Sequence, residues 1–123
     1  ETEPYRILLV DDEEEIIRTQ KIHLMRLGHQ VQTCVDGKSA FKKLQENPQA
    51  FDLIITDQTM PGMTGMQLSH KCKELWPELP IILTTGYSIE ELPERIEDAG
   101  ICALLPKPHT QTELVKLVKE IMA

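Results

Sequence analysis

The sequence predicts a single α/β domain of three layers, in which a parallel five-stranded sheet is covered by helices on both faces. Apolar runs alternate with amphipathic stretches along the whole chain, which is the pattern of successive strand–helix units. The chain has 123 residues, of which 41% are hydrophobic. A chain of this length buries roughly two-thirds of its unfolded surface, enough for one core.

The first half of the chain carries three strand signals with two helical stretches between them. We expect strands at residues 5–10, 30–35 and 51–56, and helices at residues 13–27 and 38–46. The first and third strands are nearly continuous apolar runs, which is typical of strands buried on both faces. The second alternates polar and apolar residues and is expected nearer an edge of the sheet. Gly28 and Pro48 are suitable residues to follow the two helices.

The second half continues the alternation with a helix and two more strands. They are expected at residues 65–75, 81–84 and 101–105. Thr110 and Glu113 fit a capping box for a last helix. Apolar residues follow at helical spacing, namely Leu114, Leu117, Val118 and Ile121.

The fourth helix has conflicting signals. Ser88 and Glu91 also fit a capping box, but Pro93 comes two residues later. Proline beyond the first turn removes a backbone hydrogen bond and clashes with the preceding turn. We therefore expect this helix to begin at about Pro93, with residues 88–92 as a turn, or else to be kinked.

These elements predict a (βα)5 arrangement with the flavodoxin-like strand order 2-1-3-4-5. In open sheets of this kind, sites lie beyond the carboxyl ends of the strands where the order reverses, here between the first and third strands. Asp11 and Asp12 follow the first strand, and Asp57 follows the third. Three converging carboxylates repel one another unless a cation joins them, and an oxygen-only site suits Mg²⁺.

Two further strand ends carry polar side chains. Thr85 follows the fourth strand and Lys107 the fifth, with Gly86 and Pro108 next in the chain. A hydroxyl, an ammonium and a metal beside a carboxylate are the groups needed to place a phosphoryl group on that carboxylate. Gly86 would allow close approach of the backbone, and Pro108 would fix the chain beyond the lysine.

The charge balance narrows the classes of partner. The chain has 13 Lys and Arg against 20 Asp and Glu, a formal net charge of −7. A surface of this sign disfavours direct binding to nucleic acid or to an anionic membrane. The scattered cysteines Cys34, Cys72 and Cys102 are typical of reduced thiols in a cytoplasmic protein. No stretch is long and apolar enough to cross a membrane.

Together these residues resemble the receiver domain of two-component response regulators. The set is Asp11-Asp12, Asp57, Met60-Pro61-Gly62, Gly65, Thr85 and Lys107-Pro108. The resemblance runs from about Tyr5 to Met122, with residues 5–123 as the domain. Because the chain begins with Glu1 and not with Met, residues 1–4 are interpreted as a linker or N-terminal tail.

The resemblance implies a role for each residue of the set. Asp57 would accept a phosphoryl group from a phosphohistidine, on a histidine kinase or a histidine phosphotransfer domain. Asp11, Asp12, Asp57 and the backbone carbonyl of Thr59 would hold Mg²⁺, with Mn²⁺ or Ca²⁺ as substitutes in a crystal. Lys107 would pair with a phosphoryl oxygen, and Thr85 would turn toward another.

At the level of the whole protein, the resemblance implies a signalling module and not a free-standing enzyme. Phosphorylation would switch the surface of the fourth helix, fifth strand and fifth helix, through which receivers also form homodimers. The stretch from Asp57 to Gly65 looks like receivers attached to hybrid sensor histidine kinases, so a cytoplasmic portion of such a kinase is expected. A stand-alone single-domain regulator is the alternative.

Single residues of the set also fit simpler roles, and the site as a whole fits a second class of protein. Asp12 could simply be a helix cap, with Glu15 as its capping-box partner. Lys107, taken alone, could be a solvated surface lysine. A haloacid dehalogenase-type aspartyl phosphatase also uses an aspartate and Mg²⁺, but the chain has Thr59 where that class has its second aspartate. Many receivers carry an aromatic residue three positions before the lysine. Here Leu104 stands there, which puts the usual aromatic switch in doubt.

Overall fold

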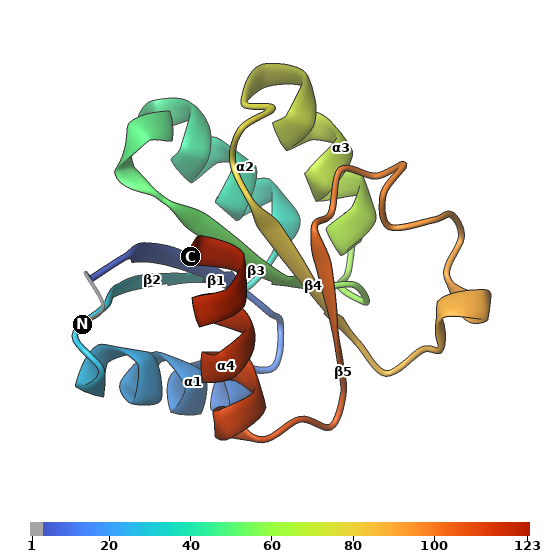
Figure 1. Ribbon diagram of the computed structural model, residues 1–123. Coiled ribbons are helices and arrows are strands. Elements are labelled where there is room, and N and C mark those ends of the chain that lie inside the picture. Colours follow the sequence, from blue (N-terminus) through green and yellow to red (C-terminus); the bar gives the residue numbers. More distant parts are fainter. Residues whose placement is uncertain (1–3) are drawn as a thin grey trace.

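The computed structural model describes residues 4–123 and confirms the predicted fold class. The strands are β1 (Arg6–Val10), β2 (Gln30–Cys34), β3 (Leu53–Asp57), β4 (Ile81–Thr85) and β5 (Ala103–Pro106). They form one parallel sheet in the order β2-β1-β3-β4-β5. The α-helices of the described residues are α1 (Glu14–Arg26), α2 (Gly37–Glu46), α3 (Gly65–Leu75) and α4 (Gln111–Met122). Figure 1 shows α1 and α4 on one face of the sheet, and α2 and α3 on the other.

The two faces of the sheet build two separate hydrophobic clusters. Successive residues of a strand point to opposite faces, so Ile7 and Leu9 pack with residues of α1 and α4. Leu8 and Val10 pack on the other side with residues of α2 and α3. These four side chains of β1 are at most 1% exposed, whereas Arg6 is exposed. Burial on both faces explains why the first and third strands read as continuous apolar runs.

Side-chain caps begin three of the four helices. Asp36 accepts a hydrogen bond from the backbone N–H of Ser39 at 2.7 Å at the start of α2. The predicted box of Thr110 and Glu113 begins α4. Another box, of Thr64 and Gln67, begins α3. That box was not predicted, although its spacing is visible in the sequence.

The expected helix from about Pro93 is wrong. The capping box of Ser88 and Glu91 does form, but it leads only into a short 3-10 turn, η2 (Ile89–Glu91). Leu92 then adopts φ −74° and ψ 148°, because the residue before a proline is driven out of the helical region. Between that point and β5 the chain forms only turns, among them hydrogen bonds from Ala99 N to the carbonyl oxygens of Arg95 and Ile96. Few residues remain between Pro93 and Gly100, and a helix that short is only marginally stable.

The segment of residues 86–102 therefore replaces the expected fourth helix. In Figure 1 it arches beyond β4 and β5 at one edge of the sheet. Residues 86–91 are all exposed, whereas Leu92 and Ala99 are buried against α3 and β4. The last helix in the chain is consequently α4, in the place of the fifth helix of the prediction.

Two remaining expectations concern the ends and the cysteines. The expected tail lies outside the described residues, apart from the exposed Pro4. Cys34 and Cys72 are buried, whereas Cys102 is exposed. Within residues 4–123, no helix has the length and hydropathy that crossing a membrane requires.

Candidate functional site

The structure brings the three predicted aspartates together. Val10 of β1 pairs in register with Thr56 of β3, so the residues that follow meet at the same edge of the sheet. Oxygen atoms of Asp11, Asp12 and Asp57 lie within 4.8 Å of one another. Asp11 and Asp57 are only 4% and 5% exposed, whereas Asp12 is exposed. The cluster is therefore half-buried, with one open side.

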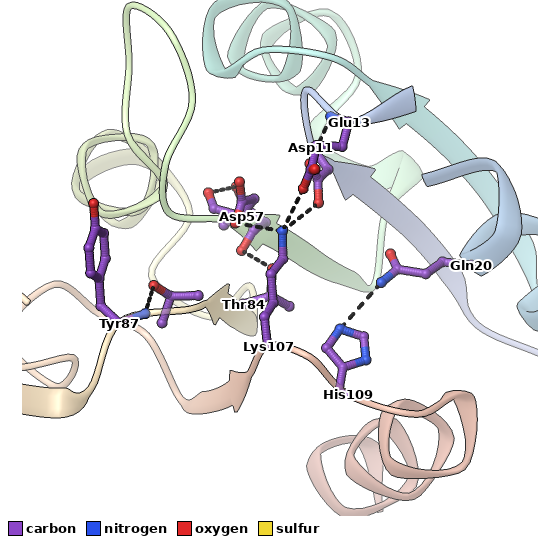
Figure 2. Close-up of polar contacts among 10 residues, drawn as sticks. Asp11, Glu13, Gln20, Asp57, Thr84, Tyr87, Lys107 and His109 are labelled. Atoms are coloured by element: carbon purple, nitrogen blue, oxygen red, sulfur yellow. Dashed lines mark hydrogen bonds and ion pairs between the residues drawn. The ribbon is translucent and has the colours of Figure 1, made fainter. Parts of the chain in front are cut away.

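Lys107 is the positive charge in this cluster. Its Nζ lies 3.1 Å from Asp57 Oδ1 and 3.2 Å from Asp11 Oδ2. Figure 2 shows the lysine reaching from the end of β5 toward carboxylates that come from β1 and β3. The Lys107–Pro108 peptide bond is cis. Three strand ends of the prediction, those of β1, β3 and β5, thus supply neighbouring groups.

The pKa values of both Asp57 and Lys107 are raised, but for different reasons. Burial, together with the neighbouring Asp11, raises the pKa of the Asp57 carboxyl despite the opposing effect of Lys107. For Lys107, burial favours the neutral amine, but the carboxylates of Asp11 and Asp57 outweigh it and raise the pKa of the ammonium. A charged Asp57 is therefore costly in this setting. Lys107 remains a cation.

Glu13 is a member of the cluster that sequence reasoning missed. Its backbone N–H donates a 2.9 Å hydrogen bond to Asp11 Oδ1, which orients that carboxylate. Its own Oε1 lies 3.4 Å from Lys107 Nζ. The signal was present in the acidic run Asp11 to Glu15, but only the fold shows which of these acids faces the lysine.

Hydrogen bonds from the first residues of α3 hold the loop after Asp57 in place. Gln58 is 5% exposed, and its Oε1 accepts a hydrogen bond from the backbone N–H of Met66 at 2.9 Å. Gly65 N–H donates to the carbonyl of Gln58 at 3.0 Å. A Cβ on Gly65 would collide with the carbonyl oxygen of Asp57, so glycine lets α3 begin directly behind the site. Thr59 is exposed in this loop, and its role as a carbonyl ligand stays a prediction.

Among the described residues, the hydroxyl of Thr85 makes no hydrogen bond to Asp57. Thr85 is the last residue of β4 and 1% exposed. Its Oγ1 accepts a hydrogen bond from the backbone N–H of Tyr87 at 3.0 Å, and its carbonyl accepts one from Lys107 N–H at 2.7 Å. Tyr87 is 47% exposed, and its ring lies apart from Lys107 in Figure 2. Nothing among the described residues lies within 4 Å of a Cβ placed on Gly86, so that glycine is not required by packing.

The donor set fits a hard divalent cation. Three carboxylates supply only oxygen atoms, which are the ligands that Mg²⁺ and Ca²⁺ prefer. Within residues 4–123 the cluster has no cysteine or histidine among its ligand atoms. Lys107 offsets part of the negative charge but leaves Asp12 on the open side.

Comparison with known proteins gives the class that the sequence resembles, a receiver domain. The model of the response regulator receiver domain matches residues 7–119. The chain is 32% identical over 117 residues to the response regulator receiver protein CpdR of Brucella abortus, covering 95% of this chain and 96% of CpdR. It is 34% identical over 104 residues to the sensor histidine kinase RcsC of Salmonella typhimurium, covering 85% of this chain and 11% of RcsC. Among solved structures, a CheY-like receiver domain protein of Methanospirillum hungatei superposes with a TM-score of 0.90 at 29% identity, covering 98% of this chain and 94% of that one.

The chain therefore belongs to the response regulator receiver domain family of two-component signalling. Receiver domains bind Mg²⁺ at an acidic aspartate cluster, and this chain has such a cluster in Asp11, Asp12 and Asp57. Its relatives include a protein of about the same length and a much longer sensor kinase.

Proposed function

We propose that Asp57 accepts a phosphoryl group in a Mg²⁺-dependent reaction, with Lys107 as its charge partner. The observation that carries this proposal is the position of Lys107 Nζ between Asp57 and Asp11, at 3.1 and 3.2 Å. An ammonium at this place can stay within reach of oxygen atoms added to Asp57. Transfer of a phosphoryl group depends mainly on such positioning and on charge neutralisation.

The step follows from the groups present. A carboxylate oxygen of Asp57 attacks the phosphorus of a phosphohistidine, a P–O bond forms, and the P–N bond breaks. The electron pair of that bond stays on the imidazole of the donor, which takes up a proton. Lys107 donates hydrogen bonds to the phosphoryl oxygens, and Asp11 and Asp12 would hold the cation. Bound Mg²⁺ would supply further neutralisation of phosphoryl charge.

The phosphorylated state is proposed to be read at the segment of residues 86–102, β5 and α4. This is the surface that the sequence assigned to the fourth helix, fifth strand and fifth helix. Thr85 supports a connection, because its hydroxyl is bonded to Tyr87 of that segment and its carbonyl to Lys107. Position 104 of β5 is a leucine that is partly buried against the core, so this proposal does not rely on an aromatic switch there. A homodimer through the same surface stays a prediction.

The proposed phosphodonor is a histidine kinase or a histidine phosphotransfer domain, and the proposed location is the cytoplasm. Attachment to a hybrid sensor kinase is supported by the match to RcsC, of which this chain spans 11%. A stand-alone regulator is supported by the match to CpdR, of which it spans 96%. The phosphatase alternative is disfavoured, because Thr59 gives no carboxylate at the position of the second aspartate.

A small phosphodonor tests the proposal without knowledge of the partner. The chain is incubated with acetyl phosphate, with and without Mg²⁺, and its intact mass is measured. We expect a phosphoryl adduct that requires Mg²⁺ and is lost in Asp57→Asn. The matched control is Asp98→Asn, which removes an exposed aspartate and should leave labelling unchanged. Labelling that persists in Asp57→Asn would refute the assignment of the acceptor.

A further inference from the structure

Glu13 is placed unusually for a residue at a helix start. It is the N-cap of α1, yet its side chain makes no capping hydrogen bond. The carboxylate turns instead toward Lys107, with Oε1 3.4 Å from Nζ (Figure 2). Side chains at this position more often accept a hydrogen bond from the first turn of the helix. The contact with the lysine has taken the place of the cap.

Three carboxylates therefore share one ammonium. Asp11 and Asp57 approach Lys107 to 3.2 and 3.1 Å and have side chains that are 6% and 7% exposed. The side chain of Glu13 is 59% exposed. Asp11 and Asp57 are fixed at strand ends, whereas Glu13 is the partner that can move into solvent.

We propose that Glu13 is a positioning residue that competes with an incoming phosphoryl group for Lys107. In the unphosphorylated chain it helps to hold the ammonium between the carboxylates. A phosphoryl group on Asp57 needs the same N–H donors, and its negative charge is repelled by Glu13. This inference rests on the proposed transfer to Asp57. Repulsion by Glu13 would raise the activation barrier for phosphoryl transfer to Asp57. The increase would be largest for small donors that carry two negative charges.

Removing the charge of Glu13 tests the idea with little change of shape. In Glu13→Gln, the second-order rate of Mg²⁺-dependent phosphorylation by acetyl phosphate should rise about two- to fivefold, the scale of a partly exposed charge pair. The rise should be smaller with phosphoramidate, which carries less negative charge at neutral pH. It should also fall toward unity in high salt, where exposed charges are screened.

Glu14→Gln is the matched control. Glu14 is the next residue and the first of α1, and it is exposed. It borders a different groove, together with Arg18 and Lys21. Both variants lose one charge at the same helix end, so they should lose the same small amount of stability from the helix dipole. Only Glu13→Gln should gain rate.

The outcomes separate the two proposals. An unchanged or slower rate in Glu13→Gln would overturn the inference, as would an equal gain in Glu14→Gln or equal gains with the two donors. In each of these cases labelling at Asp57 would still stand. A wild-type chain that takes no phosphoryl group from either donor would overturn the proposed function, and this inference with it.

Discussion

The hydroxyl oxygen of Thr85 accepts a hydrogen bond from the backbone N–H of Tyr87 at 3.0 Å. Within residues 4–123 it makes no hydrogen bond to Asp57. This contact ties the last residue of β4 to the start of the segment of residues 86–102. A movement of the hydroxyl toward a group on Asp57 would break it and would release the backbone of Tyr87.

The Thr85 contact predicts that a group can bind at Asp57 without the full structural response of residues 86–102. In Thr85→Val, which has nearly the same shape but no hydroxyl, beryllofluoride should still bind at Asp57 in the presence of Mg²⁺. The chemical shift changes that it causes in residues 86–102 should be smaller than in the wild type. The measurement is a pair of backbone NMR spectra, with and without beryllofluoride.

The control for this prediction is Thr84→Val, one residue earlier in β4. Thr84 is also buried, but its hydroxyl lies 3.5 Å from the carbonyl oxygen of Thr56. The response of residues 86–102 should therefore be preserved. A full response in Thr85→Val would show that the segment senses the site by another route.

The carboxylate cluster should cost stability when no metal is bound. Burial and Asp11 raise the pKa of Asp57, which means that its charged form is disfavoured in the folded chain. Asp57→Asn removes this charge, and we expect the free energy of unfolding at neutral pH to rise by about 1 kcal/mol in chelator-treated buffer. Urea denaturation measures the change.

Addition of Mg²⁺ should narrow that difference. The cation offsets the repulsion only where all three carboxylates are present, so it should stabilise the wild type more than Asp57→Asn. The exposed-site variant Asp98→Asn should stay within about 0.5 kcal/mol of the wild type in both buffers. A variant Asp57→Asn that is less stable than the wild type without metal would contradict this view of the cluster.

Two glycines beside the site should respond differently to alanine. In Gly65→Ala, the new methyl group would meet the carbonyl oxygen of Asp57 and lie 2.7 Å from Leu83 Cδ1. We expect a loss of about 1–3 kcal/mol, the usual range for overpacking. In Gly86→Ala nothing described lies within 4 Å of the methyl group, and the change should be within about 0.5 kcal/mol. Thermal and urea unfolding compare the pair.

The cap of α2 should make part of the stability depend on pH. The hydrogen bond from Ser39 N–H lowers the pKa of Asp36. A carboxyl group with a lowered pKa in the folded state stabilises the fold above its unfolded pKa, and this stabilisation is lost as the pH falls through the folded pKa. Asp36→Ala should thus cost about 1 kcal/mol at neutral pH, the usual value of such a cap. The difference from the wild type should shrink below about pH 4.

Asp36→Asn distinguishes the charge from the cap. Asparagine keeps an oxygen that can accept from Ser39, so its stability at neutral pH should lie near that of the wild type. Because asparagine does not titrate, the Asp36→Asn variant should not show the loss of stability on acidification that Asp36 causes in the wild type. Stability of Asp36→Ala equal to that of the wild type at neutral pH would mean that the cap contributes nothing.

Much of the site could be predicted because parallel strands end at a common edge. Placing Asp11, Asp12, Asp57 and Lys107 required only the strand ends and the strand order. The fourth helix could not be predicted in the same way. Its capping box forms as the sequence indicates, but the box acts over one turn, and Pro93 removes the donor that the next turn needs.

The sequence by itself determined the alternation of strands and helices, the two-sided burial of the central strands and the edge at which the acidic residues meet. These follow from periodicity and from the geometry of parallel pairing, which are local or nearly local. Only the tertiary structure decided which charges share Lys107 and where the hydroxyl of Thr85 points. Those contacts join residues far apart in the chain or depend on side-chain rotamers, and no pattern of neighbouring residues records them.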